Sequence, residues 1–241
     1  MLLRSEIEYS VKRYFKFFLA LIVISAACDQ GDEIETSRTP EDYLPLKKGH
    51  YQIYDVSEVT YELGVPHTQT YELKTVVVDS FINTAGYYSF VVHRSFRNAG
   101  ETAWTYKDTW SASTTEREAT MQEQNIPYVK FKVPMVEGLE WNGNLYNAAG
   151  EDLYELENLY ASETFGAETF DDCITINQND NQDYVVFLDQ RKEVYARNIG
   201  LIHKETNQLH YCTQESSGCL GQQIIEEGLT YQQTIKAHGV E

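Results

Sequence analysis

The segment from Trp104 to Trp110 carries the most suggestive ligand-binding pattern in the chain. Trp104, Tyr106, Asp108 and Trp110 alternate with smaller or basic residues, so a β-strand would place these four side chains on one face. Aromatic rings on one face can stack on sugar rings or line the mouth of a lipid cavity, and they also build cores. Asp108 indicates that part of this face is wet. We therefore take Trp104, Tyr106 and Trp110 as a candidate ligand face, with core packing as the competing interpretation.

Residues 177–183 place asparagine and aspartate oxygens at alternating positions, as a calcium loop does. An EF-hand that began at Asn177 would need Gly at its sixth position and Glu at its twelfth, where Gln182 and Leu188 stand. The pattern therefore indicates a polar hairpin turn, and we predict no metal site and no cofactor.

Signatures of known catalytic sites are missing from the sequence: GxSxG, HExxH, GxxxxGK[ST] and SxxK do not occur. His93, His203 and His210 could each act as a general base, but no spacing pairs any of them with a nucleophile or an orienting acid. Carboxylates are too numerous for their separations to be informative. We therefore expect a protein that is not an enzyme.

Cys212 and Cys219 bracket the turn-like segment TQESSG, and we predict a disulfide between them. On the chain-entropy model, closing so short a loop adds roughly 2.5 kcal/mol. Cys173 would then be a buried free thiol, although the three cysteines that follow Cys28 allow three different single bridges.

The beginning of the chain indicates export. Residues 17–27 form an apolar run that follows Lys12, Arg13 and Lys16 and ends in small residues. The run is shorter than the roughly twenty apolar residues that a membrane-spanning helix needs. Basic flank, short apolar core and small-residue end are typical of a cleaved signal peptide, which we place at residues 1–27.

Cys28 directly follows the small residues, and Ser25 to Cys28 resembles the lipobox of bacterial lipoproteins, with Ser25 where Leu is usual. The resemblance implies that Cys28 is acylated and becomes the first residue of the mature chain. The acidic residues Asp29, Asp32 and Glu33 are similar to a signal that sends Bacteroidetes lipoproteins to the cell surface. We therefore expect attachment to the outer membrane, on its periplasmic or cell-surface face.

Charge and composition restrict the partners of the mature protein. The chain has a formal charge of −18, and removing residues 1–28, with four bases and two acids, leaves −20. Such an anion repels phosphate backbones and anionic lipid, which argues against nucleic acid as a partner and against flat docking on anionic lipid. Residues 28–45 contain proline, glycine and acids without an apolar period, and we read them as a flexible tether. Residues 46–241 are long enough for one β-rich domain.

Strand patterns dominate that domain. In YVKFKVP, Val129, Phe131 and Val133 alternate with Lys130 and Lys132, which predicts an apolar face and a charged, wet face. Short turns connect the strand-like segments, which favours an antiparallel meander of eight to eleven strands. Residues 116–124 are the only plausible helical turn inside the domain, with a loop as the alternative. We predict an all-β fold, a single curved meander sheet that is half-barrel or barrel-like, with at most one or two short helices.

Three stretches look like a group of uncharacterised Bacteroidetes lipoproteins: YLPLKKGHYQIYDV at 43–56, EWNGNLYNAAGEDLYE at 140–155 and EVYARNIGLIHKE at 193–205. The resemblance implies the β class and the envelope location, and it implies no activity. We expect a lipid-anchored, non-catalytic binding or assembly module whose partner is an envelope protein, a glycan or a lipid. The alternatives are a carrier of a lipid or other apolar ligand in a β cavity and a glycan-directed hydrolase.

Overall fold

The computed structural model describes residues 38–241, which form twelve strands, one short α-helix and one 3-10 turn. No helix in this part of the chain is long and apolar enough to cross a membrane. The elements are α2 (Pro40–Tyr43), β1 (His50–Glu62), β2 (Val65–Ile82), β3 (Tyr88–Asn98), β4 (Thr105–Thr114), β5 (Glu118–Glu123), β6 (Ile126–Lys132), β7 (Glu140–Asn142), β8 (Leu153–Phe165), β9 (Glu168–Asp183), β10 (Phe187–Ala196), β11 (Gly200–Tyr211), η1 (Glu215–Ser217) and β12 (Ile225–Val240).

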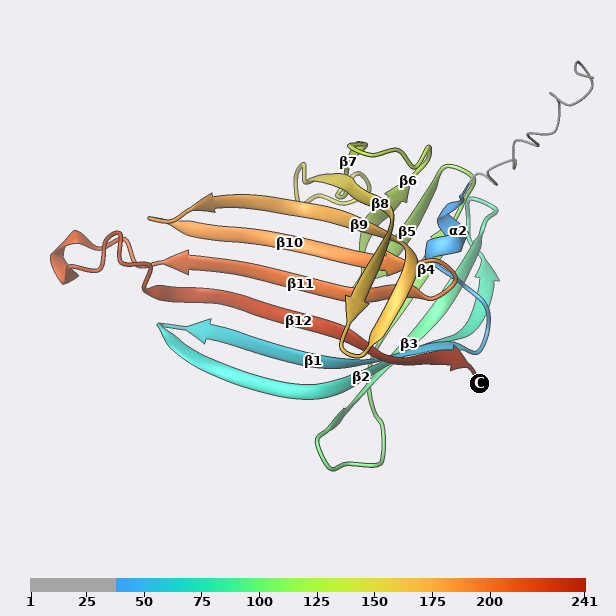
Figure 1. Ribbon diagram of the computed structural model, residues 1–241, viewed down its shortest axis with the longest axis horizontal. Helices are drawn as coiled ribbons and strands as arrows, with labels where there is room; N and C mark the ends of the chain where they lie inside the picture. The colour runs from blue at the N-terminus through green and yellow to red at the C-terminus, as the bar shows by residue number, and fades with distance from the viewer. Residues whose placement is uncertain (1–37) are drawn as a thin grey trace, which may run out of the picture. The chain divides into compact units, whose positions relative to one another are not determined.

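All twelve strands belong to one antiparallel sheet in the order β6-β5-β4-β3-β2-β1-β12-β11-β10-β9-β8-β7 (Figure 1). Neighbours in the sheet are neighbours in sequence except where β1 pairs with β12. The two outer strands meet, because the Val129 amide donates to the Gly143 carbonyl at 2.9 Å and Trp141 Nε1 donates to the Val129 carbonyl at 2.9 Å. The predicted fold class is confirmed: the molecule is an all-β meander that curls into a nearly closed barrel.

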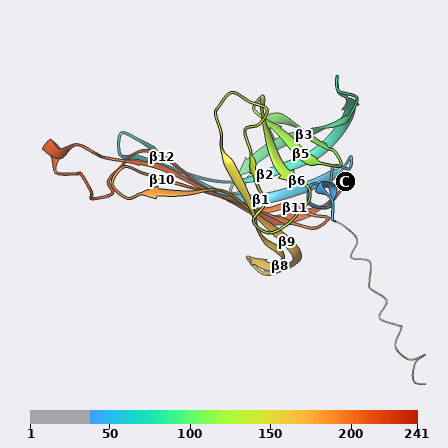
Figure 2. The same cartoon turned by 90° about the horizontal axis from the view of Figure 1, so that it is seen from above.

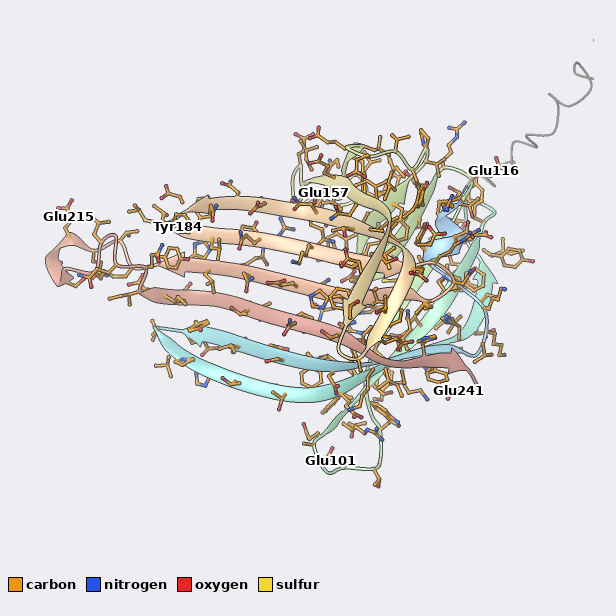
Figure 3. All side chains as sticks on the ribbon, in the orientation of Figure 1. Glu101, Glu116, Glu157, Tyr184, Glu215 and Glu241 are labelled. Carbon is orange, nitrogen blue, oxygen red and sulfur yellow. A yellow bond between two sulfur atoms is a disulfide. The ribbon has the colours of Figure 1, made fainter. Side chains whose placement is uncertain are left out.

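The strands of this sheet differ in length, which divides it into a curled part and a flat part. Strands β1, β2 and β9 to β12 extend beyond the others and form a flat blade in the two perpendicular views (Figures 1 and 2). Tyr184 and Glu215, at two of the hairpin ends, lie at the far end of the blade (Figure 3). Residues 65–70 of β2 are all exposed, because the blade has no second layer of chain to cover it.

Two clusters of buried apolar side chains hold the curled part together. The first lies around Phe131, Trp141, Tyr154 and Tyr195, and Phe131 packs edge-on against Tyr195 with ring centroids 4.6 Å apart. The second joins Tyr54 and other residues of β1 and β2 to residues of β9 to β12. In Figure 1 the β8–β9 hairpin crosses β10 to β12, and its Phe165 stacks on His203 of β11 at 4.4 Å.

The folded domain begins earlier than predicted. Tyr43 is fully buried, and its hydroxyl donates to Asp172 Oδ1 at 3.0 Å. Arg38 Nε donates to the same carboxylate at 3.1 Å. Residues 38–45 therefore belong to the folded domain, which begins at residue 38 and not at residue 46 as predicted. The predicted signal peptide, the lipidation site Cys28 and the first part of the tether lie outside the described residues.

Two further expectations about elements need correction. Residues 116–124 were expected to hold the only helix-like stretch, but residues 118–123 form strand β5. Ala119 is fully buried there and Met121 packs against the first core cluster, so tertiary contacts override the local helical preference. The sheet also has one strand more than the upper limit of the estimate. Its three-residue β7 is too short to show a period of its own.

Candidate functional site

The curled sheet encloses an open cavity of about 490 Å³, which we call the barrel cavity. Every strand except β7 contributes side chains to its wall. The charged lining residues are the cations Arg94, Lys107, Lys130, Arg191 and Lys204 and the carboxylates Glu58, Glu123 and Glu193. The aromatic lining residues are Tyr54, Tyr71, Trp110, Tyr128, Tyr154, Tyr195 and Tyr231. The wall is thus both aromatic and charged.

The charge balance of this wall differs from that of the whole chain. Five lining cations face three lining carboxylates, whereas the complete chain carries a formal charge of −18. Three further aspartates, Asp108, Asp152 and Asp189, are not lining residues but pair with the lining residues Arg94 and Arg191. The cavity is therefore a locally balanced environment inside a strongly acidic protein.

Glu193 on β10 is the centre of a buried ion cluster. Its Oε1 accepts hydrogen bonds from Lys130 Nζ at 2.9 Å and Lys204 Nζ at 2.8 Å, and its Oε2 accepts one from the Tyr195 hydroxyl at 2.6 Å. Lys130 Nζ also donates to Glu123 Oε1 at 2.9 Å. Because Lys130 belongs to β6 and Glu193 to β10, the pair ties opposite walls of the barrel together.

This cluster keeps its groups charged. Burial by itself would raise the pKa of Glu193, but Lys130 and Lys204 outweigh it and hold that pKa far below the ordinary value. Burial opposes the charge of Lys130 too, yet Glu123 and Glu193 raise its pKa well above the usual range. The pKa of Glu123 is lowered because Lys130 and Lys204 overcome its desolvation. None of these groups is poised to exchange a proton near neutral pH.

A second cluster of polar side chains surrounds Arg94 on β3. The Arg94 side chain is 7% exposed. Its guanidinium stacks 3.6 Å above the Trp110 ring, and its Nη1 donates to Asp108 Oδ2 at 3.1 Å. The Nε atom of Arg94 and the Nε1 atom of Trp110 are buried and have no hydrogen-bond partner among the described residues. Buried donors without acceptors are unfavourable by about 1–3 kcal/mol each, so this corner of the cavity is short of acceptors.

Lys107 extends this corner from strand β4. Its Nζ donates to the Tyr71 hydroxyl at 3.2 Å and lies 4.8 Å from the centre of the Tyr71 ring. The Tyr71 hydroxyl donates in turn to Glu58 Oε2 at 3.1 Å. Burial and the neighbouring charge of Arg94 lower the pKa of Lys107, although Glu58 and Asp108 act in the opposite direction.

Arg191 is a cation of the wall whose guanidinium donates to carboxylates of the protein. Its two terminal nitrogens donate to the two Asp152 oxygens at 2.8 and 2.9 Å, and its Nε donates to Asp189 Oδ1 at 2.7 Å. Desolvation opposes the charge, but these hydrogen bonds and charges raise the pKa of Arg191 above its ordinary value. Its donors are committed to the protein itself, which assigns Arg191 a structural role.

Three polar residues of the wall are placed there by β-bulges. Lys107 is the extra residue where Arg94 pairs with Asp108 and Ser95 pairs with Tyr106. Similar register shifts leave Lys130 and Gln178 without cross-strand partners. A bulge re-aims side chains relative to strict alternation. Alternation alone put Lys130 on a wet face opposite Phe131, but Lys130 is 4% exposed and lines the cavity.

The bulge at Lys107 also divides the predicted ligand face, so the prediction of one shared face is wrong. Trp110 lies in the cavity wall. Tyr106 is 60% exposed and packs edge-on against His93 at 5.9 Å, and Trp104 lies under the Arg97 guanidinium at 4.3 Å. Trp104 and Tyr106 are absent from the wall of the barrel cavity. The sequence offered no signal for this bulge, because no glycine or proline marks it.

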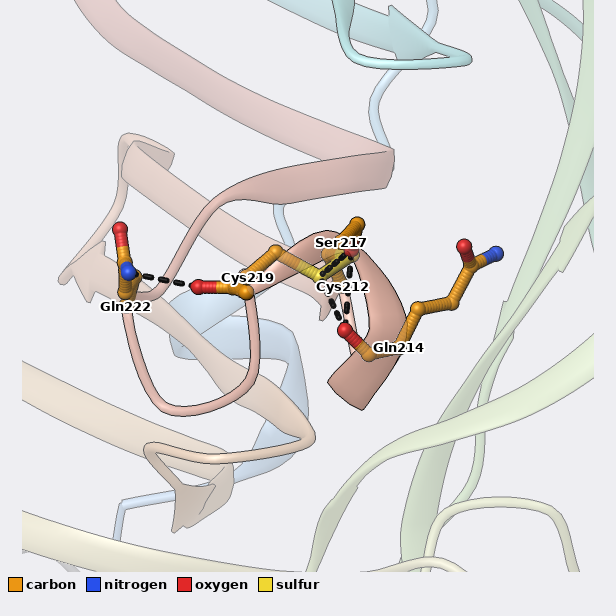
Figure 4. Close-up of a disulfide and its surroundings, with 6 residues drawn as sticks. Cys212, Gln214, Ser217, Cys219 and Gln222 are labelled. Atoms are coloured by element: carbon orange, nitrogen blue, oxygen red, sulfur yellow. Dashed lines mark hydrogen bonds between the residues drawn. A yellow bond between two sulfur atoms is a disulfide. The ribbon is translucent and has the colours of Figure 1, made fainter.

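Two of the described cysteines form a disulfide and the third is free. Cys212 and Cys219 are joined by a disulfide that closes the loop around η1, with their Cα atoms 5.8 Å apart (Figure 4). Ser217 Oγ donates to the Gln214 carbonyl inside this loop at 2.9 Å. Cys173 is free and fully buried, and burial raises the pKa of its thiol to about 11. Such a thiol is protonated at neutral pH and unreactive.

The three candidate histidines and the asparagine and aspartate residues of 177–183 lie outside the wall of the barrel cavity. His93 is exposed, His203 is buried against Phe165, and His210 is exposed on the blade. Residues 177–183 form the end of β9, where Asn179 Nδ2 donates to Asp189 Oδ2 at 3.0 Å. Within residues 38–241, no three His, Cys, Asp or Glu side chains are grouped so that they could hold a metal ion.

Comparison with known proteins gives two similar structures. No family model and no curated protein matches the sequence. One similar structure, from Bacteroides fragilis, is provisionally named an exported protein with a YmcC-like fold; identity is 10%, the TM-score is 0.44, and the match covers 80% of this chain and 96% of that chain. The other, from Parabacteroides distasonis, is provisionally named a lipoprotein, with 10% identity, a TM-score of 0.42 and the same coverage.

Proposed function

We propose that the chain is an exported protein, attached to the outer membrane through acyl chains on Cys28, whose folded domain binds a polar ligand without transforming it. The location follows from the leader and lipobox pattern of residues 1–28. The binding role rests on one observation, the barrel cavity of about 490 Å³. A space of this size, walled by rings and a few placed polar groups, is what small-ligand sites provide.

The wall favours a polar ligand over an apolar one. Five cations and three carboxylates line the barrel cavity. An acyl chain in this space would remove water from these groups and offer no hydrogen bonds in return, which is unfavourable. A carrier of lipid, the first alternative, is therefore less well supported than a module that binds a ligand with hydroxyl, amide or charged groups.

The buried carboxylates also favour binding over glycan hydrolysis, the second alternative. Hydrolysis of a glycosidic bond needs a carboxylic acid whose pKa is raised so that it can donate a proton. Glu123 and Glu193, the most buried carboxylates of the wall, share Lys130, and the pKa of each is lowered. They remain ionised and act as structural partners of the lysines.

Native mass spectrometry of the full-length protein, extracted from envelopes in mild detergent, tests the binding role. We expect a non-covalently bound small molecule on the wild-type chain and its loss from Gln208→Trp, which adds a bulky ring to the wall of the barrel cavity. Gln208 is exposed on β11 and lines the cavity. The matched control is Gln232→Trp, because Gln232 is exposed on the neighbouring β12 and lies outside the cavity wall. Equal loading of all three proteins would contradict the proposal.

A further inference from the structure

One cation of the barrel cavity differs from the other four. Arg94, Lys130, Arg191 and Lys204 each have a carboxylate oxygen within 3.1 Å, supplied by the protein. Lys107 has no ion pair within 4.0 Å among the described residues, and its ammonium donates a hydrogen bond to the Tyr71 hydroxyl. We propose that Lys107 binds the anionic group of the ligand in the barrel cavity, an inference that rests on the proposed function.

The position of Lys107 makes its charge available to a ligand. A β-bulge turns its side chain into the cavity, and Tyr71 holds the ammonium through both its hydroxyl and its ring. The residue as a whole stays exposed, so the ammonium is held in place without being sealed off. A charged side chain that is already held in place before the ligand arrives loses less conformational freedom on binding.

The surroundings of Lys107 lack acceptors rather than donors. Asp108 is committed to Arg94 at 3.1 Å, and Glu58 accepts the Tyr71 hydroxyl at 3.1 Å. Beside them, Arg94 Nε and Trp110 Nε1 have no acceptor. A carboxylate or phosphate brings two or more acceptor oxygens, which is the chemistry that this corner is missing.

The charges near Lys107 predict how substitutions should change the affinity for an anion. Arg94 adds a second positive charge, while Glu58 and Asp108 offset part of the total. Because Glu58 repels an anion at this site, its removal should strengthen anion binding, whereas removal of Lys107 should weaken it. These opposite effects follow from charge and are not expected of a purely structural role.

Isothermal titration of the full-length protein in detergent tests the inference with three probes of one ring size. Glucuronate supplies a carboxylate, glucose 1-phosphate a phosphate, and glucose no charge. We expect the wild-type protein to bind at least one anionic probe more tightly than glucose. The anionic probe that binds more tightly shows whether the site prefers a carboxylate or a phosphate. Lys107→Met should weaken that probe about tenfold, as expected for a lost charged hydrogen bond. Glu58→Gln should strengthen it.

The control is Lys192→Met, since Lys192 is 51% exposed, pairs with Glu205 and lies outside the cavity wall. It should leave the affinity for the anionic probe unchanged. Anionic probes that bind no better than glucose, or that bind Lys107→Met as tightly as the wild type, would overturn the inference. If the native mass spectra still show a cavity-dependent ligand, the binding role survives that result. Circular dichroism of each variant confirms that it is folded.

Discussion

At the scale of single residues, the lysines Lys107 and Lys130 show how local sequence and tertiary placement diverge. Lys130 stands between Val129 and Phe131, and strict alternation would point its side chain away from these apolar neighbours. Lys107 stands between Tyr106 and Asp108, and strict alternation would likewise place it on the other face. Each is instead the extra residue of a β-bulge and enters the barrel cavity. Bulges depend on how two strands are paired, and one strand alone contains no record of its partner's register.

The buried pair of Lys130 and Glu193 gives the first prediction. Lys130→Met leaves Glu193 with Lys204 but removes the shared partner of Glu123, and breaking a buried pair is expected to lower the free energy of unfolding by about 3–5 kcal/mol. Glu193→Gln should also destabilise, because it leaves the lysine ammonium groups short of a counter-ion. Urea unfolding followed by tryptophan fluorescence measures both.

The double variant Lys130→Met/Glu193→Gln separates the pair from its parts. Its loss of stability should be smaller than the sum of the two single losses, because neither Lys130 nor Glu193 is then present as a buried charge that lacks the other. Lys132→Met is the control, since Lys132 lies 3.8 Å from Glu118 and is 33% exposed. Additive losses in the double variant would show that the two groups do not act together.

His203 predicts a stability change in mildly acidic solution. Burial lowers its pKa below the ordinary 6.5, although the nearby Glu205 partly opposes this and Lys192 adds to it. The unfolded chain therefore takes up a proton near pH 6.5 that the folded chain refuses, and stability falls as the pH drops below that value. His203→Phe keeps the stack on Phe165 and should flatten this dependence between about pH 6.5 and 5.

Chemical denaturation at a series of pH values checks this prediction. Folding lowers the pKa of carboxylates such as Glu72 and Glu205 below the ordinary value of 4.5. These groups therefore change the free energy of unfolding only at lower pH. The exposed His67 offers a control, and His67→Phe should leave the slope unchanged. An unaltered slope in His203→Phe would assign the pH dependence to another group; His50, whose pKa burial also lowers, is the next candidate.

At the scale of elements, strand existence was more predictable than strand pairing. Long alternating segments such as β6 and β12 were identified as strands from their period. β5 was misjudged as helix-like because its six residues carry helix-forming side chains. The sheet imposes the extended conformation on β5 by pairing it on both sides, with β4 and β6.

The disulfide of the β11–β12 connection gives a prediction at this scale. It closes a loop between residues 212 and 219, and the chain-entropy model assigns such a short loop roughly 2.5 kcal/mol. Cys212→Ser/Cys219→Ser should lower the free energy of unfolding by about this amount. A reducing agent should lower the wild type to the same level and leave the double variant unaffected, which serves as the control. Stability of the double variant equal to that of the oxidised wild type would contradict the expectation.

At the scale of the whole molecule, the proposed acyl anchor on Cys28 gives a prediction about location that does not depend on the barrel cavity. Cys28→Ser removes the only thiol that the lipobox pattern offers for acylation. We expect this variant to leave the membrane fraction, and mass spectrometry should find acyl chains on Cys28 of the wild type alone. Cys173→Ala is the control and should stay with the membrane. Membrane association of Cys28→Ser as strong as that of the wild type would contradict the anchor.

The fold class and the single sheet could be predicted because period-two alternation and short turns are local signals. Acidic composition and the leader could likewise be interpreted without a structure, since both depend on residue types alone. The barrel cavity could not, because its wall collects side chains from eleven strands whose registers are set by long-range pairing. Only the tertiary structure decided that Arg94, Lys107 and Trp110 meet inside while Tyr106 faces out. A one-residue bulge in β4 places each later side chain of that strand on the opposite face from the one that strict alternation predicts.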